Sequence, residues 1–256
     1  MAARSRSILR ILMSRRSIRA FKQGRISPAV VRLLVEAGQR APCTYQSYCV
    51  IVIDREDLKS KIAELADDQL FVKAPLLLLI CIDFRRTSLL FDTLSERHVL
   101  RSDKHPVETI EAIFEAGLFA ENIVIAAEAL GYGSVMLDYA LWMGREVSSL
   151  LGLPKGVTPL IFLCIGAPAE KPPLRPRLPL DMILHFDSYK EPSVEELRRY
   201  IEEAAKKLAK ENYLQKYANV NKTYSEFLLE KISMDKQVEK LNSQISIFLN
   251  SNGVKI

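Results

Sequence analysis

Residues 109–133 decide the fold and read TIEAIFEAGLFAENIVIAAEALGYG. Apolar side chains recur at helical spacing from 109 to 130 and surround the helix nearly completely, which is typical of a buried helix. Gly131 and Gly133 then end the helix, because glycine is favoured just past a helix C-terminus. We therefore expect one long central helix, buried in the core and followed by a short strand at 134–137.

Further strands are expected before and after this helix in the sequence. The apolar run at 76–83 indicates a strand covered on both faces. The β-branched run at 48–54 predicts another strand, and the run at 157–166 predicts a third core strand. Helical spacing predicts shorter helices at 7–14, 29–40, 57–66 and 144–151, while 85–102 shows only some helical character at 95–100. These elements predict an α+β fold, with a central mixed or antiparallel sheet flanked by helices.

The C-terminal quarter of the chain has a different character. Ser193 is placed to cap a charged helix over 194–213, which carries Glu and Lys or Arg at helical spacing. A second amphipathic helix is expected over 235–249. We expect a folded domain at 1–190 and a helical C-terminal extension at 191–256.

Composition excludes several classes of protein. Of the 256 residues, 48% are hydrophobic and 26% are charged, which is ordinary for a globular protein and excludes wholesale disorder. No apolar run approaches the ~20 residues that cross a bilayer. The four cysteines form no C-x-x-C pair and the three histidines are dispersed, so we expect no metal site. Scattered cysteines are typical of a reducing compartment, and we expect a cytoplasmic protein.

Positive charge is concentrated at the N-terminus. The net charge is +5, and the first 35 residues contain no Asp or Glu. Such a block attracts phosphates, nucleic acid or an acidic surface. An acid-poor terminus rich in Arg and Ser can also be an organellar transit peptide. We expect the segment to be retained, because residues 15–21 resemble part of a folded site.

The classical signatures of active sites are absent. The chain has no G-x-G-x-x-G, P-loop, H-E-x-x-H or G-x-S-x-G motif, so a nicotinamide would bind without a Rossmann turn. Two arginine clusters remain, at 15–19 (RRSIR) and 175–177 (RPR). Arginine presents a rigid fork of donors that suits phosphate, and the flanking prolines limit the freedom of the second cluster. On composition alone, solvated surface charge is the favoured interpretation of both clusters.

Several blocks in a fixed order make the chain recognisable. They are RRSIRAF at 15–21, AP at 41–42, QSY at 46–48, AENIVIAAEALGYG at 120–133, LLGLP at 150–154, IGAP at 165–168 and RPRLP at 175–179. The chain from about 8 to 189 resembles the nitroreductase family of flavin-dependent NAD(P)H oxidoreductases. It is most similar to the NADPH-preferring branch with longer C-terminal excursions.

The resemblance implies an intertwined homodimer that holds FMN at each of two equivalent interface sites. It implies that Arg15, Arg16, Ser17 and Arg19 lie along the phosphate, the ribityl chain and the N1–O2 edge of the flavin. The other implied cofactor-binding residues are Cys43 and Thr44 from the other subunit, Gln46, Gln69, Leu137, Asp138 and Tyr139 near N5, and Arg175 and Arg177 at the phosphate. No protein residue is implied as catalytic, because the flavin carries the hydride chemistry.

Three functions follow from these observations. The first is an FMN-dependent oxidoreductase that uses NADPH or NADH, with a nitroaromatic, a quinone or free flavin as acceptor, in a ping-pong mechanism. The second keeps the fold and the flavin but catalyses reductive dehalogenation or flavin cleavage. The third is a basic adaptor that binds nucleic acid through the N-terminal arginines, although few aromatic residues interleave with them. We expect the first function, with no nucleic acid and no membrane as partner.

Overall fold

The structure, a computed structural model, describes residues 8–66, 74–94, 106–232 and 236–255. The chain divides into two compact units, one of Met1–Glu170 with Lys236–Ile256 and the other of Lys171–Asp235. The boundary expected at 190 therefore differs from the division between these units. The last helix belongs to the first unit, although it follows the second in the sequence.

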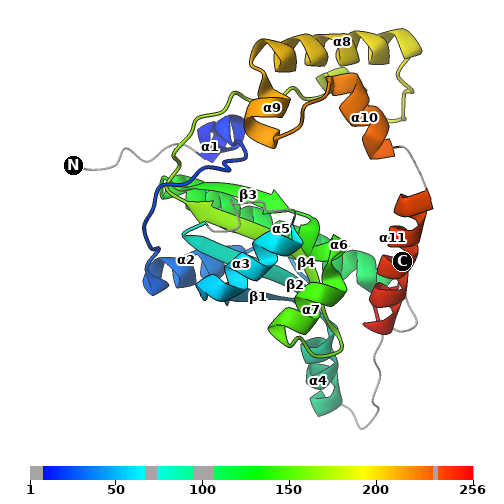
Figure 1. The fold of residues 1–256 in the computed structure, drawn as a ribbon. Coiled ribbons are helices and arrows are strands. Elements are labelled where there is room, and N and C mark those ends of the chain that lie inside the picture. Colours follow the sequence, from blue (N-terminus) through cyan, green and yellow to red (C-terminus); the bar gives the residue numbers. More distant parts are fainter. Residues whose placement is uncertain (1–7, 67–73, 95–105, 233–235, 256) are drawn as a thin grey trace. The chain divides into compact units, whose positions relative to one another are not determined.

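The centre of the first unit is a four-stranded sheet (Figure 1). Its order is β1-β2-β4-β3, and each neighbouring pair is antiparallel. The strands are β1 (Tyr48–Ile53), β2 (Leu76–Asp83), β3 (Gly133–Leu137) and β4 (Val157–Gly166). Of the two arrangements expected from the sequence, the antiparallel one is confirmed.

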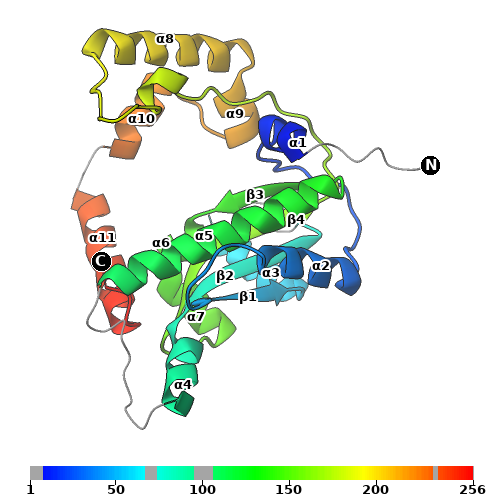
Figure 2. The ribbon, with the colours of Figure 1, turned by 180° about the vertical axis from the view of Figure 1, so that it is seen from behind.

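Helices cover both faces of the sheet (Figures 1 and 2). Successive side chains of β2 point to opposite faces of the sheet. Leu78 packs toward α2 (Pro28–Gly38) and α5 (Pro106–Ala129), whereas Leu79 packs toward the other face. That face is covered by α3 (Glu56–Leu65), α6 (Tyr139–Trp142) and α7 (Gly144–Leu151). All eight residues of β2 are buried, as expected for a strand with seven apolar residues in succession between two helical layers.

The long central helix α5 is buried on only part of its circumference. Ala116, Phe119 and Ile123 are 0–1% exposed against the sheet and α2. Ile110 and Phe114, in contrast, are 62% and 64% exposed in the single chain. The expectation of a helix buried nearly all round is therefore wrong for this chain taken alone. Even so, none of the helices described is long and apolar enough to span a membrane.

Three more helices belong to the first unit, namely α1 (Ile8–Ser14), α4 (Phe84–Leu94) and α11 (Lys236–Ser251). Helix α4 lies where the sequence showed no clear pattern, whereas residues 95–100 are outside the described part. Asp83, the last residue of β2, caps α4, since its Oδ1 accepts the N–H of Arg86 at 2.8 Å. The close fit of α11 is seen at Gly144, where an added Cβ would lie 2.4 Å from Phe248.

The second unit is helical apart from its N-terminal segment. It contains a 3₁₀ turn (Leu180–Met182) and the helices α8 (Val194–Lys210), α9 (Tyr213–Ala218) and α10 (Tyr224–Ile232). Ser193 and Glu196 form the capping box that the sequence indicated for α8. The helix expected to reach 213 ends at Lys210, because Asn212 adopts a left-handed conformation with φ 47°. Leu208, Tyr213 and Leu214 form the core of this unit.

Candidate functional site

The segment of residues 15–21 runs beside β3, at one edge of the sheet. Ser17 lies opposite Ser134 in a parallel bridge, and the Ile18 N–H donates to the carbonyl oxygen of Ser134 at 2.9 Å. Ile18 is buried over Gly133, where an added Cβ would lie 2.6 Å from its Cγ1. The segment approaches the strand this closely because residue 133 has no side chain.

The backbone of Arg19 is held by a carboxylate from the far end of the first unit. Oε1 of Glu170 accepts the N–H groups of Arg19 and Ala20, at 2.5 and 3.0 Å. Ala20 in turn accepts the N–H of Ala169 at 2.9 Å. These bonds fix the direction in which the Arg19 side chain leaves the segment.

The side chain of Arg19 is half-buried, and one of its terminal nitrogens is fully buried. Within the described residues, its Nη1 is buried and makes no hydrogen bond. The guanidinium lines a cleft of about 310 Å³ whose charged residues are Arg19, Lys22, Arg25, Lys59, Asp54 and Glu56. Four cations therefore face two carboxylates. A buried N–H donor without an acceptor costs about 1–3 kcal/mol, so the position favours a ligand that supplies an acceptor or a negative charge.

The neighbouring arginines have protein partners. Nε of Arg15 lies 3.6 Å from Oε1 of Glu121 on α5, and Nε of Arg16 donates to the carbonyl oxygen of Ser14 at 3.1 Å. Both side chains remain partly exposed. Arg15 can therefore turn toward an added anion, whereas Arg19 is the arginine with an unmet donor.

Residues 137–139 lie at the C-terminal end of β3, the same strand that holds the 15–21 segment. Leu137 is buried as the last residue of the strand, and Asp138 precedes helix α6. The carboxylate of Asp138 is exposed and accepts the indole N–H of Trp142 at 3.2 Å. One strand thus places the backbone of 137–139 and the arginine segment on a common support.

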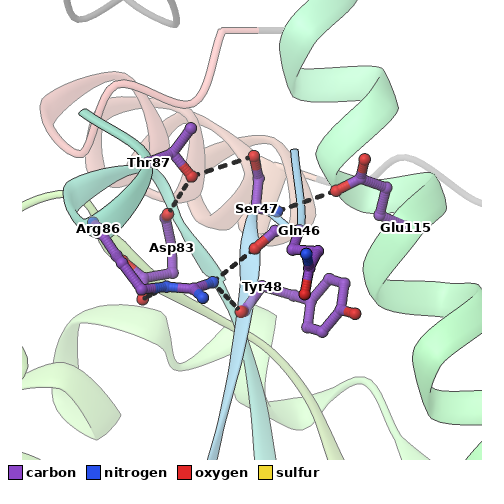
Figure 3. A network of polar contacts seen from close by, with 7 residues as sticks. All are labelled: Gln46, Ser47, Tyr48, Asp83, Arg86, Thr87 and Glu115. Atoms are coloured by element: carbon purple, nitrogen blue, oxygen red, sulfur yellow. Dashed lines mark hydrogen bonds and ion pairs between the residues drawn. The ribbon is translucent and has the colours of Figure 1, made fainter. Parts of the chain in front are cut away.

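A separate loop carries Cys43, Thr44 and Gln46, all of which are exposed. The loop is anchored to the buried Glu115 of α5, whose Oε1 accepts the N–H groups of Thr44 and Tyr45. The second carboxylate oxygen of Glu115 accepts the N–H of Ser47 at 2.9 Å, as Figure 3 shows. This loop and the 15–21 segment contact α5 at different points, Glu115 and Glu121.

Burial alters the acidity of groups next to this loop. Burial, followed by the negative charges of Cys43 and Glu115, raises the pKa of Tyr48. Cys49 and Cys81 lie opposite one another in the pairing of β1 and β2. A hydrogen bond from the buried Cys81 thiol lowers the pKa of Cys49, and the same bond together with burial raises the pKa of Cys81.

Arg175 and Arg177 belong to the second unit. Both side chains are exposed. The guanidinium of Arg175 lies over the ring of Tyr213, 5.8 Å from its centroid, and Nη1 of Arg177 donates to the carbonyl oxygen of Pro176 at 3.3 Å. Neither arginine has a carboxylate partner among the described ion pairs, so their charges are available to an anion.

Comparison with known proteins identifies the family. A profile described as "Nitroreductase family" matches residues 12–167, more than half of the chain. The chain belongs to the nitroreductase family. The family expected from the ordered sequence blocks is thus confirmed, and the chain is an oxidoreductase of that family.

Relatives of this nitroreductase-family chain cover most of its length. An FMN reductase (NAD(P)H) of Bacillus subtilis strain 168 is 32% identical over 185 residues, 71% of this chain and 74% of that protein. An NADPH-dependent oxidoreductase of Staphylococcus aureus strain MSSA476 is 29% identical over 251 residues, 96% of this chain and 92% of that protein. The structure of NfrA1 from B. megaterium matches with a TM-score of 0.82 at 26% identity, over 98% of this chain and 100% of that one.

The candidate residues of this nitroreductase-family chain fall into separate groups. The structure places Arg15, Arg16, Ser17 and Arg19 beside the start of β3, where Ser17 pairs with Ser134, whereas residues 137–139 lie at and just past the other end of the same strand. The loop with Cys43, Thr44 and Gln46 is a second group. Arg175 and Arg177 form a third group in the other unit, and Gln69 lies outside the described residues.

Sequence reasoning missed the residues that hold these segments. Glu170 and Glu115 fix the arginine segment and the loop, and neither was singled out. Glu115 carried a usable signal, since it is an acidic residue among the apolar positions of a helix that faces a sheet. Glu170 carried none, because it follows the last strand in a polar, proline-rich stretch.

Proposed function

We propose that the chain is a homodimeric, FMN-dependent oxidoreductase. It takes a hydride from NADPH or NADH and passes it to a nitroaromatic, a quinone or free flavin in a ping-pong mechanism. Membership of the nitroreductase family supports the reaction class, and the relative from B. subtilis is itself an FMN reductase.

The observation that carries this proposal is the buried, unpartnered Nη1 of Arg19. A flavin presents hydrogen-bond acceptors at its N1–O2 edge, and negative charge develops there on reduction. A cation fixed in advance at that edge stabilises the charge without reorganising during the reaction. The residues present therefore fit FMN. Glu170 holds the backbone of Arg19, so the position of the arginine is fixed before the flavin binds.

The other residues have roles in binding. In this proposal Arg15, Arg16 and Ser17 contact the ribityl chain and the phosphate, and Arg175 and Arg177 close around the phosphate by charge-assisted bonds. The backbone of 137–139 faces N5, where bound FMN supplies the hydride chemistry. Gln69 adds a polar contact to the ring. No side chain needs to act as an acid or base at the reacting atom.

The exposed side of α5 supports the dimer. Ile110 and Phe114 are more than 60% exposed and lie one turn apart on this helix. Large apolar side chains gathered on one face mark an interaction surface. An obligate interface of this type buries about 2,000 Å² or more. In the dimer, Cys43, Thr44 and Gln46 of one chain would lie against the flavin of the other.

Steady-state kinetics test the reaction order. Without a Rossmann turn, the nicotinamide and the acceptor should use one site in turn. We expect parallel double-reciprocal plots of rate against NADPH concentration when a quinone is varied. FMN released by denaturation should account for the yellow colour of the purified protein. Intersecting lines would show that both substrates bind together, and a colourless protein that gains no activity from added FMN would refute the cofactor.

A further inference from the structure

The loop of residues 43–47 and the first residue of β1 are held from two sides by charged side chains, one buried and one exposed (Figure 3). On one side is Glu115, which is 3% exposed. Its two carboxylate oxygens accept three backbone N–H groups, those of Thr44, Tyr45 and Ser47. These backbone groups are the partners that the described residues provide for a charge buried this deeply, so the loop and the carboxylate stabilise each other.

On the other side of the loop is Arg86. Its Nη2 donates to the carbonyl oxygens of Gln46 and Tyr48, at 2.5 and 2.6 Å. Its Nε donates to Oδ2 of Asp83 at 3.3 Å. Asp83 also accepts the backbone N–H of Arg86 at 2.8 Å. The guanidinium is thus held at Nη2 by the two carbonyl groups and at Nε by the carboxylate.

Gln46 shows what this arrangement imposes on the loop. Its φ of 51° is in the left-handed region, which non-glycine residues seldom adopt. The bond from Arg86 to its carbonyl oxygen holds this conformation. With N–H groups directed to Glu115 and carbonyl groups directed to Arg86, the exposed side chains of Cys43, Thr44 and Gln46 face outward.

We propose that Glu115 and Arg86 are positioning residues for flavin binding, which presupposes the proposed function. They hold the loop of 43–46 in one conformation before the flavin binds. The loop then loses little conformational entropy when it docks against the flavin in the partner subunit. Preformed donors and surfaces bind more tightly because less conformational freedom is lost. The two residues act through the loop and do not touch the flavin.

The charge of Glu115 is required because three donors converge on it. Glutamine has the same shape, but its amide offers one oxygen and two N–H donors. If that oxygen accepted from Thr44 and Tyr45, the amide nitrogen would face the N–H of Ser47. In the reverse orientation, the amide nitrogen would face the two N–H groups of Thr44 and Tyr45. Glu115→Gln therefore leaves at least one buried N–H unpaired in either orientation.

FMN titration of the apoprotein tests this role. For Glu115→Gln we expect the Kd for FMN to rise by about tenfold or more. We also expect the visible circular dichroism of bound FMN to change at saturation, because the loop lies against the ring. Glu111→Gln, one turn earlier on the same helix, is the matched control and should change neither. Wild-type affinity and an unchanged spectrum for Glu115→Gln would overturn the proposal, whereas wild-type protein that binds no FMN would refute the proposed function.

Arg86→Lys provides a second variant if Glu115→Gln does not fold. A lysine cannot bridge two carbonyl groups and a carboxylate with a planar fork, so the same rise in Kd and spectral change are expected. Unchanged binding by a folded Arg86→Lys would also overturn the proposal.

Mixed dimers test whether the loop acts in the partner. Glu115→Gln chains are mixed with Arg177→Ala chains, so that each heterodimer has one site with both defects and one with none. About one quarter of all sites should regain wild-type affinity after random pairing of the two chains. No recovery would show that the loop serves its own chain and would overturn the proposed placement.

Discussion

At the scale of single residues, the difference between Arg15 and Arg19 is the most informative feature. Arg15 lies 3.6 Å from Glu121, so part of its charge is balanced within the protein. Arg19 keeps a buried donor without an acceptor in the described part of the chain. Proteins rarely leave such a donor unpaired, and a bound flavin would remove the deficit.

Arg19→Ala should alter the redox behaviour of the cofactor more than its retention. Loss of a charge-assisted bond worth about 1.5–3 kcal/mol should lower the flavin midpoint potential by about 30–60 mV for a two-electron couple. Reduction by NADPH should slow accordingly. Potentiometric titration measures the shift. Arg198→Ala, on the exposed surface of α8, should leave the potential unchanged. An equal potential in both variants would contradict the placement of Arg19 at the N1–O2 edge of the flavin.

At the scale of elements, the contact between the N-terminal segment and β3 organises the site. Ile18 packs directly over Gly133, and the adjacent Ser17 pairs with Ser134. The strand continues from there to Leu137, where the backbone proposed to face N5 begins. The position of Arg19 relative to 137–139 therefore depends on how closely the segment approaches the strand.

Gly133→Ala should disturb this contact. An alanine Cβ would lie 2.6 Å from Cγ1 of the buried Ile18, which is too close for two carbon atoms that are not bonded to each other. Overpacking of this kind costs about 1–3 kcal/mol, so thermal unfolding should occur at a lower temperature. In the background of Ile18→Ala, where Cγ1 is absent, the same change should cost much less. Additive losses in this double-mutant cycle would contradict the described contact.

The sequence predicted elements better than it predicted the contacts between them. Predominantly apolar runs located β2 and β4 to the residue, because most of their residues are buried between the helical layers. Helix α10 was missed although Thr223 and Glu226 form a capping box, because short amphipathic segments resemble loops. Of the two anchors of the site, Glu115 carried a sequence signal, whereas Glu170 could not be predicted, since it meets Arg19 across 151 residues.

At the scale of the whole molecule, α5 connects the parts of the first unit. It packs against the sheet through Phe119 and Ile123. It contacts Arg15 through Glu121 and the loop of 43–47 through Glu115. The same helix exposes Ile110 and Phe114, the surface proposed for the second subunit. In a dimer built on this surface, one helix would support residues of both flavin sites.

The central claim is that arginines of this chain hold FMN by its phosphate, and titration of the apoprotein with FMN and riboflavin tests it most directly. The wild type should bind one FMN per chain and bind riboflavin, which lacks the phosphate, far more weakly. Arg177→Ala should weaken FMN binding by about ten- to a hundred-fold and leave riboflavin binding unchanged. Arg198→Ala, also in the second unit, should match the wild type. Equal FMN affinity in Arg177→Ala and Arg198→Ala, or no preference for FMN over riboflavin in the wild type, would contradict the account.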